Sequence, residues 1–274
     1  MEVTGGFIVG FDADREDIFD RQIRFIQEAA IPTAMVGLLT ALPQTRLHTR
    51  LAAEGRILGD SSGGNNTHDL DLNFVPRMDP NLLRAGYKRV LREVYKPSHY
   101  FARCLDLLRR MKHQKASCRK IRMLELRAFV HSLVRQTFTR YAFAYWFYLL
   151  RALARRPFMA PEIVTLAVKG HHFFTITQRL LEVERFKDGL ERLRQNLEAR
   201  VKRACQDKRE SLAILEAYRF RLVERALARY NRLNPDFRSS AIKAIQDFRD
   251  ATERLLAHNH QPAGITSQPS STSR

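Results

Sequence analysis

The chain has 274 residues, 45% of them hydrophobic and 28% charged, a composition that excludes a disordered or fibrous protein and fits a globular one. Its formal net charge of +18 favours anionic partners: phospholipid headgroups, nucleic acid or an acidic protein. No run of about 18 apolar residues is present, so no membrane-spanning helix is expected. No signal peptide precedes the first strand pattern, which predicts a cytoplasmic protein.

The charge is distributed unevenly. Residues 1–60 carry six basic and nine acidic side chains, a net charge of −3, so the remainder of the chain carries +21. The three cysteines, Cys104, Cys118 and Cys205, are far apart and show no CxxC spacing. We expect them to be reduced thiols.

Residues 1–58 predict a βαβ unit. Residues 3–11 form a short apolar run with glycines, typical of a buried strand that a ligand or another backbone approaches closely. Asp14 is the expected N-cap of an amphipathic helix over about 15–30. Residues 34–42 (AMVGLLTAL) show no alternation and predict a strand buried on both faces, with a short helix following from about 45 to 54. Parallel strands joined by a helix imply a right-handed crossover.

Residues 59–78 are polar and rich in glycine, asparagine and aspartate, and they predict a linker. Within it, His68, Asp69 and Asp71 have the chemistry of metal ligands but lack a spaced partner set. An ordinary polar loop is therefore the preferred interpretation, and no metal site is predicted.

Residues 79–260 predict a basic helical domain. Asp79 and Pro80 begin the first helix. Others are expected over about 98–108, 119–155, from Pro161, over about 184–230 and over about 235–258. Along 184–230 basic residues alternate with glutamates, as in a solvated helix with ion pairs. The tail over 261–274 is expected to be disordered.

Few side chains in this domain suggest chemistry. His171 and His172 are adjacent, so on a helix they diverge and do not chelate as a pair at i, i+4 would. The aromatic block over 141–150 is flanked by arginines. It has two interpretations: an interfacial helix on lipid phosphates, or a core helix with charged flanks.

A resemblance emerges from the order of several motifs. Residues 6–12 (GFIVGFD) resemble the fifth-strand motif of radical S-adenosylmethionine (SAM) enzymes, GxIxGxxE, and residues 34–43 are similar to their sixth strand. Further matching segments are residues 73–76, 86–87, 95–103, Trp146 and residues 155–157. This set resembles the cobalamin-binding-domain radical SAM proteins with a helical C-terminal extension, a group that includes hopanoid methylases. The resemblance covers roughly residues 1–180.

The resemblance implies an α/β then mostly α fold, in which about two βα units of a partial (β/α) barrel precede a helical domain with long helices. It further implies that Gly6, Ile8 and Gly10 pack against the adenine of SAM, helped by the backbone around Leu39 and Thr40. Ala13 stands where the family motif has glutamate, and the CxxxCxxC that binds the family's iron–sulfur cluster is absent. No catalytic residue is therefore assigned.

These points predict a C-terminal fragment of a cobalamin-dependent radical SAM enzyme, such as a methyltransferase acting on a lipid or other hydrophobic substrate. Lacking ligands for the cluster and the cobalamin, it is expected to be inactive alone and to need a separately encoded N-terminal half. The alternative is a cationic helical adaptor on an anionic membrane surface, at the inner face of the membrane, or on nucleic acid. Interleaved glutamates make nucleic acid the less favoured partner.

Overall fold

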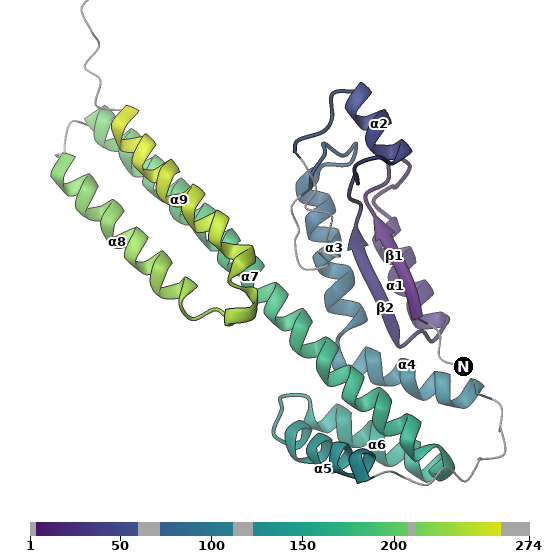
Figure 1. The fold of residues 1–274 in the computed structure, drawn as a ribbon. Coiled ribbons are helices and arrows are strands. Elements are labelled where there is room, and N and C mark those ends of the chain that lie inside the picture. The colour runs from purple at the N-terminus through teal and green to yellow at the C-terminus, as the bar shows by residue number, and fades with distance from the viewer. Residues whose placement is uncertain (1–3, 60–71, 112–122, 208–211, 259–274) are drawn as a thin grey trace, which may run out of the picture. The chain divides into compact units, whose positions relative to one another are not determined.

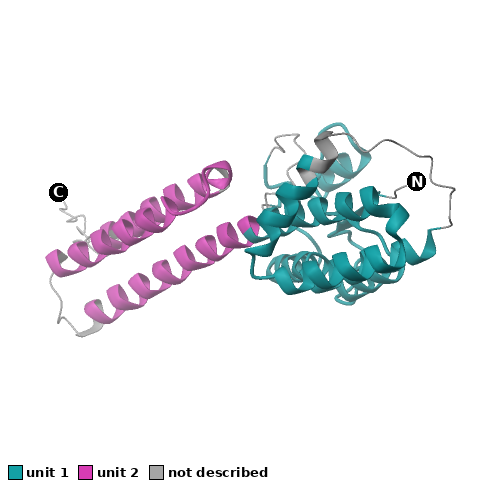
Figure 2. Cartoon of the chain, turned by 90° about the horizontal axis from the view of Figure 1, so that it is seen from below, with its two compact units in different colours: residues 1–178 teal, residues 179–274 magenta. Residues whose placement is uncertain are grey.

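The computed structural model describes residues 4–59, 72–111, 123–207 and 212–258. Two compact units, residues 1–178 and 179–274, divide the chain within one helix (Figures 1 and 2). Most of the described residues are helical, and two parallel strands lie near the N-terminus, as the sequence predicts. The elements of the first unit are β1 (Thr4–Val9), α1 (Ile18–Glu28), β2 (Thr33–Leu38), α2 (Arg46–Ala53), α3 (Pro80–Val94), α4 (Pro97–Arg110), α5 (Met123–Thr137), α6 (Ala142–Arg155), the 3₁₀ turn η1 (Pro157–Met159) and the start of α7 (Ala160–Asp207).

The two strands pair in parallel, with Thr4 opposite Thr33 and Val9 opposite Leu38. One face of the pair packs under α1 and α3, where Val9, Ala34 and Val36 are buried (Figure 1). The opposite face is open, because no other described element covers it. The prediction of a strand over 34–42 buried on both faces was therefore wrong. Strand β2 ends at Leu38, and Leu39 and Ala41 beyond it belong to a separate core cluster with Leu51 and Phe74.

Two buried tyrosines of the segment around α3 close the outer edge of β2. The N–H of Leu39 donates to the carbonyl of Val9 in β1 at 2.8 Å. Because successive carbonyls of a strand point to opposite edges, those of Ala34 and Val36 lie on the edge away from β1. Tyr95 Oη donates to the Ala34 carbonyl at 2.6 Å, and Tyr87 Oη donates to the Val36 carbonyl at 3.1 Å. These polar groups thus have partners without another strand.

Arg103 of α4 is almost fully buried and joins three segments. Its guanidinium donates to the carbonyl of Ile31 at 2.9 Å and to the carbonyl of Val94 at 3.0 Å. It also reaches the amide oxygen of Gln27 at 3.1 Å. Burial lowers the pKa of Arg103. The three oxygens replace part of the water around the cation and hold α1 and α3 to α4, while Nη2 of Arg103 has no hydrogen-bond partner among the described residues.

These contacts explain why the first unit does not divide at the predicted linker over 59–78. Residues 1–58 and 79–178 share one core through β2, α1, α3 and α4. The described part of the linker is also packed: Phe74 forms an isolated antiparallel bridge with Ile57 and is buried. Residues 60–71 lie outside the described ranges.

The expected single helix over 119–155 consists of two helices, α5 and α6. Hydrogen bonds from Thr139 N–H to the Gln136 carbonyl and from Ala142 N–H to the Thr139 carbonyl form tight turns between them. The Thr139 hydroxyl adds a bond to the same Gln136 carbonyl at 2.7 Å. Threonine side chains compete in this way with helical hydrogen bonds, which ends α5.

In the second unit the rest of α7 packs with α8 (Leu212–Tyr230), the turn η2 (Pro235–Phe237) and α9 (Ser239–His258). Instead of one helix over 184–230, α7 runs unbroken through Pro161 to Asp207, and α8 is separate. Pro161 is tolerated because it lies in the first turn of α7. The predicted ion pairs are present on α7, where Arg194 contacts Glu191 at 2.7 Å and Glu198 at 3.4 Å. The predicted tail, 261–274, lies outside the described residues.

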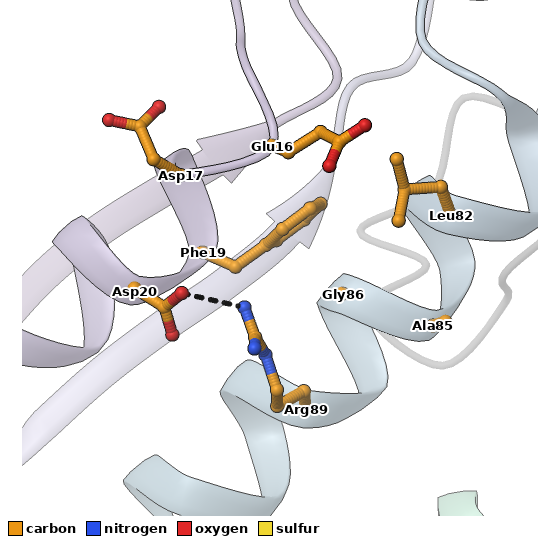
Figure 3. A pocket seen from close by; sticks show the side chains of 8 residues that line it. All are labelled: Glu16, Asp17, Phe19, Asp20, Leu82, Ala85, Gly86 and Arg89. Carbon is orange, nitrogen blue, oxygen red and sulfur yellow. Dashed lines mark ion pairs between the residues drawn. The ribbon is translucent and has the colours of Figure 1, made fainter.

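A close contact between α1 and α3 occurs at Gly86, where the ring of Phe19 lies over the glycine (Figure 3). A β-carbon built on Gly86 would lie 2.3 Å from ring atoms of Phe19. A surface pocket of about 440 Å³ opens beside this contact, and Arg89 pairs there with Asp20 at 3.1 Å. Gly86 therefore sets the distance between the two helices that cover the sheet.

We predict that Gly86→Ala destabilises the protein by about 1 to 3 kcal/mol, since the added methyl group overpacks the contact with Phe19. Thermal unfolding followed by circular dichroism measures the effect. Gly189→Ala is the matched control, because its β-carbon would meet nothing closer than Arg229 at 3.7 Å. At that helical position alanine stabilises by about 0.5 to 1 kcal/mol. Equal effects of the two changes would contradict the packing argument.

Candidate cofactor-binding edge of the sheet

The open face of the sheet carries two glycines and two apolar side chains. Gly6 pairs with Met35, and Ile8 pairs with Gly37, so all four residues point to the same side. Ile8 and Met35 are about half exposed, and β-carbons built on Gly6 and Gly37 would meet nothing within 4 Å. The face is thus apolar and has room for a flat group directly on the backbone.

The carboxyl ends of both strands lie at one edge of the sheet, because the strands are parallel. Gly10 follows β1 with a φ of +110°, a backbone conformation that favours glycine. A β-carbon at this residue would contact Leu39 and Leu83. Leu39 is buried, whereas Thr40 is exposed and its hydroxyl lies 3.5 Å from the Leu38 carbonyl.

The five residues that the resemblance implies for SAM therefore divide into two groups. Gly6 and Ile8 lie on the open face, and Thr40 is exposed near its carboxyl end. Gly10 and Leu39 are buried beneath that end, where the turn after β1 needs them. Gly37 lies on the same face as Gly6 and Ile8, although sequence reasoning had not selected it. The strand register, with Gly37 opposite Ile8, is the signal that identifies it.

Asp14 was predicted to cap the first helix, and this was wrong. The N-cap residue of α1 is Asp17, whose side chain makes no capping hydrogen bond. Asp14 instead accepts hydrogen bonds from the N–H groups of Gly10 at 2.8 Å and Phe11 at 3.0 Å. Aspartate commonly binds nearby backbone N–H groups in this way, and here it fixes the turn that follows β1.

Asp12 lies at the centre of a charged network beside this turn. Arg56 binds its carboxylate with both terminal nitrogens, at 2.7 and 3.1 Å, and Arg50 approaches it to 2.9 Å. Arg56 also pairs with Glu54 at 2.7 Å. The hydrogen bonds from Arg56 are the main reason that the pKa of Asp12 lies below its usual value. A carboxylate held in its charged form by two guanidiniums is a weak proton acceptor, so Asp12 has a structural role.

Asn73 was also missed as a structural residue. Its amide donates to the Ala41 carbonyl at 2.8 Å and accepts from the Ala41 N–H at 2.9 Å. The side chain thus imitates the backbone of a neighbouring strand and fixes the segment that follows β2. Only the resemblance of residues 73–76 to the family had marked this position.

The other candidate residues have separate locations. His68, Asp69, Asp71 and Cys118 lie outside the described residues, and Cys104 is a buried thiol in α4. Tyr141 and His171 Nδ1 form a hydrogen bond of 2.5 Å, while His172 is exposed. Within the described ranges, no three His, Cys, Asp or Glu side chains are grouped so that they could hold a metal ion. In the same ranges, no helix combines the length and apolarity needed to cross a membrane.

We predict that Asp12→Asn lowers the free energy of unfolding by about 2 kcal/mol at pH 7, because the charged hydrogen bonds to Arg56 and Arg50 are lost. The pKa of Asp12 is lowered from 3.8 in the folded state. Its stabilisation is therefore present above that value and disappears as the pH falls through the lowered pKa.

Urea unfolding of wild type and variant across pH 2 to 7 measures this difference. We expect the two curves to converge at the acid end. Asp17→Asn is the control, since the carboxylate of Asp17 is 60% exposed and its contact with Arg21 is 3.9 Å long. A constant difference between wild type and Asp12→Asn at every pH would contradict the assignment.

Comparison with known proteins identifies the family to which the chain is similar. Residues 45–185 match a family described as a domain of unknown function, DUF4070. An uncharacterized methyltransferase from Synechocystis sp. is 30% identical over 202 residues, which cover 72% of this chain and 37% of that protein. The hopanoid C-2 methylase of Rhodopseudomonas palustris is 29% identical over 180 residues, which cover 63% of this chain and 32% of that protein. No solved structure matches the chain.

The chain thus spans about a third of the length of the curated relatives it matches. These matches confirm the resemblance to the C-terminal part of hopanoid-methylase-like proteins that the ordered motifs had indicated. The family match includes α2 to α6 and continues into α7. The chain belongs to the DUF4070 family.

Proposed function

We propose that this chain is the C-terminal portion of a SAM-using methylase of the cobalamin-dependent radical SAM class, and that it supplies one wall of the SAM site. In this proposal β1 and β2 are the last two strands of a partial (β/α) barrel. Their open face is the inner face of that barrel, and α1 and α3 belong to its outer layer. The methylase relatives support the general chemistry.

The observation that carries the proposal is the asymmetry of the sheet. Among the described elements, helices cover one face, and the other face is apolar, glycine-containing and half exposed. In parallel α/β proteins both faces of a sheet are normally covered, so a bare apolar face indicates a missing layer or barrel interior.

The two edges of the sheet also differ in which groups bind their outward-facing carbonyls. Buried tyrosine hydroxyls occupy the outer carbonyls of β2, as a terminal strand requires. Among the described residues, no strand pairs with the other edge of β1, where Gln22 donates to the Ile8 carbonyl at 3.0 Å. We place the preceding barrel strands at this edge of β1, where Gln22 would have to release the Ile8 carbonyl.

The open face fits an adenine ring. Gly6 and Gly37 leave the backbone bare, and Ile8 and Met35 supply apolar contacts beside them. Flat heterocycles bind favourably against such surfaces, with polar backbone groups fixing their orientation. Exposed Thr40 lies at the carboxyl end of the face, where ligands of parallel sheets gather.

The residues present do not fit an iron–sulfur cluster. The sequence contains no CxxxCxxC, and Cys104 is buried in the helical core of α4. We therefore assign the cluster and the cobalamin to a part of the enzyme outside these residues, and this chain itself carries no step of the reaction. A hydrophobic substrate is proposed for the assembled enzyme, since one relative is a hopanoid methylase.

A titration of isotopically labelled chain with SAM, followed by amide chemical shifts, tests the adenine contact. We expect weak, saturable shifts at Gly6, Ile8 and Gly37, because one wall of a site binds weakly. Gly6→Val should abolish them while the fold is retained, since a β-carbon at Gly6 meets nothing within 4 Å. Gly59→Val, at another open glycine, is the control and should leave the shifts unchanged.

Shifts that persist in Gly6→Val, or that appear away from the sheet, would refute the adenine assignment. A separate experiment tests whether the iron–sulfur cluster is held outside this chain. Reconstitution of this chain alone with iron and sulfide should give no four-iron absorption band and no SAM cleavage. Either signal from the isolated chain would contradict the proposed division of the site.

A further inference from the structure

The helical hairpin of α5 and α6 has apolar side chains on its outer surface. Helix α6 buries Tyr145, Tyr148, Leu149 and Ala152 on one side. On the other side Phe143 and Phe147 are separated by one helical turn, with Leu150 beside them. We define the hairpin face as Val130, Val134, Phe138, Phe143, Phe147 and Leu150, all of which are exposed. The two phenylalanines nearest the turn, Phe138 and Phe143, are 87% and 86% exposed.

The inner side of α5 carries buried polar groups. Ser132 and Gln136 are buried, and the Gln136 amide donates to Ser132 Oγ at 2.8 Å and to the Ala167 carbonyl at 3.1 Å. Val130 and Val134, on the same helix, face outward. The same outer side carries Arg127, His131 and Arg135, which are also exposed. The outer side of α5 thus combines exposed valines with exposed basic side chains, which suits a partner that is both apolar and anionic.

The charges around the hairpin face have a single sign. From residue 126 to residue 161 the sequence contains six arginines and no aspartate or glutamate. Arg127, Arg135, Arg140 and Arg155 are exposed. The guanidinium of Arg151 lies over the ring of Phe147, 5.3 Å from its centroid. Arginines next to exposed aromatic rings complement a surface that is apolar inside and anionic at its boundary.

We propose that the hairpin face docks the protein onto an anionic phospholipid surface. Phe138, Phe143 and Phe147 enter the boundary between headgroups and acyl chains, and Arg135 and Arg140 bind lipid phosphates. The hairpin lies in the plane of the interface and does not cross the bilayer. A second protein would have to supply both an apolar groove and many carboxylates to satisfy the same surface. An anionic bilayer offers both along its whole area.

Sedimentation of the complete chain with vesicles tests the proposal. We expect binding to vesicles that contain phosphatidylglycerol, and much weaker binding to vesicles of phosphatidylcholine alone. Added salt should weaken the binding, since the arginine contribution is screened. Phe138→Ser with Phe143→Ser should reduce the partition constant at least about tenfold, because two exposed rings lose their insertion into the lipid. Arg135→Gln and Arg140→Gln should each reduce it about fivefold.

Matched controls lie in the second unit. Phe220 of α8 is 61% exposed and also has arginines beside it in sequence, so Phe220→Ser tests whether any exposed phenylalanine has the same effect. Arg225→Gln and Arg232→Gln repeat the loss of charge at other exposed positions. These controls should change binding less than twofold. Circular dichroism of each variant establishes that it is folded.

Four results would overturn the proposal. The first is a failure of wild-type protein to sediment with anionic vesicles, and the second is sedimentation of the double serine variant as strong as that of wild type. In the third result, wild type forms a dimer without lipid, the double serine variant is monomeric, and neither binds vesicles. That result would assign the hairpin face to a second copy of the chain. An equal effect of Phe220→Ser would reduce the interaction to unspecific adhesion and would also contradict docking by this face.

Discussion

The first unit depends on hydrogen bonds that reach β2 and the residue just before it from the helices. A parallel pair of strands is marginal by itself, because half of its backbone polar groups face no neighbour. Tyr87 and Tyr95 supply hydroxyl donors to the outer carbonyls of β2, and Arg103 holds the Ile31 carbonyl just before the strand. Each donor is buried, so water cannot easily replace it. The two strands are therefore stabilised by the surrounding helices and would not form a stable sheet by themselves.

Much of this fold follows from local sequence patterns. The glycine-punctuated run over 3–11, the apolar stripe of the first helix and the Asp79–Pro80 start of α3 are each determined by neighbours along the chain, and they appear as predicted within a few residues. The division of the long helix over 119–155 depends on Thr139, whose bond to the Gln136 carbonyl has no strong signal in a helical pattern. Helix α7 continues through Pro161 because this proline lies in the first turn, where the missing N–H would have had no partner within the helix.

The candidate site was harder to predict because its parts meet through tertiary packing. The resemblance suggested Gly6 and Ile8, but Gly37 joins them only through the strand register. Asp12 and Asp14 are two residues apart, yet one binds arginines from around α2 and the other binds the backbone of its own turn. An acidic cluster after a strand is compatible with either role. Only the positions of Arg50 and Arg56 decide between them.

The two tyrosines on the outer edge of β2 also bear on how copies of this chain can associate. Exposed strand edges are templates for unlimited edge-to-edge growth. Here the tyrosines leave β1 as the edge without a pairing strand in the described sheet. Pairing of two β1 edges would join two copies and place a closed edge at both ends of the resulting sheet. We therefore expect association through the strands to stop at a pair, because the tyrosines oppose the addition of a strand at β2.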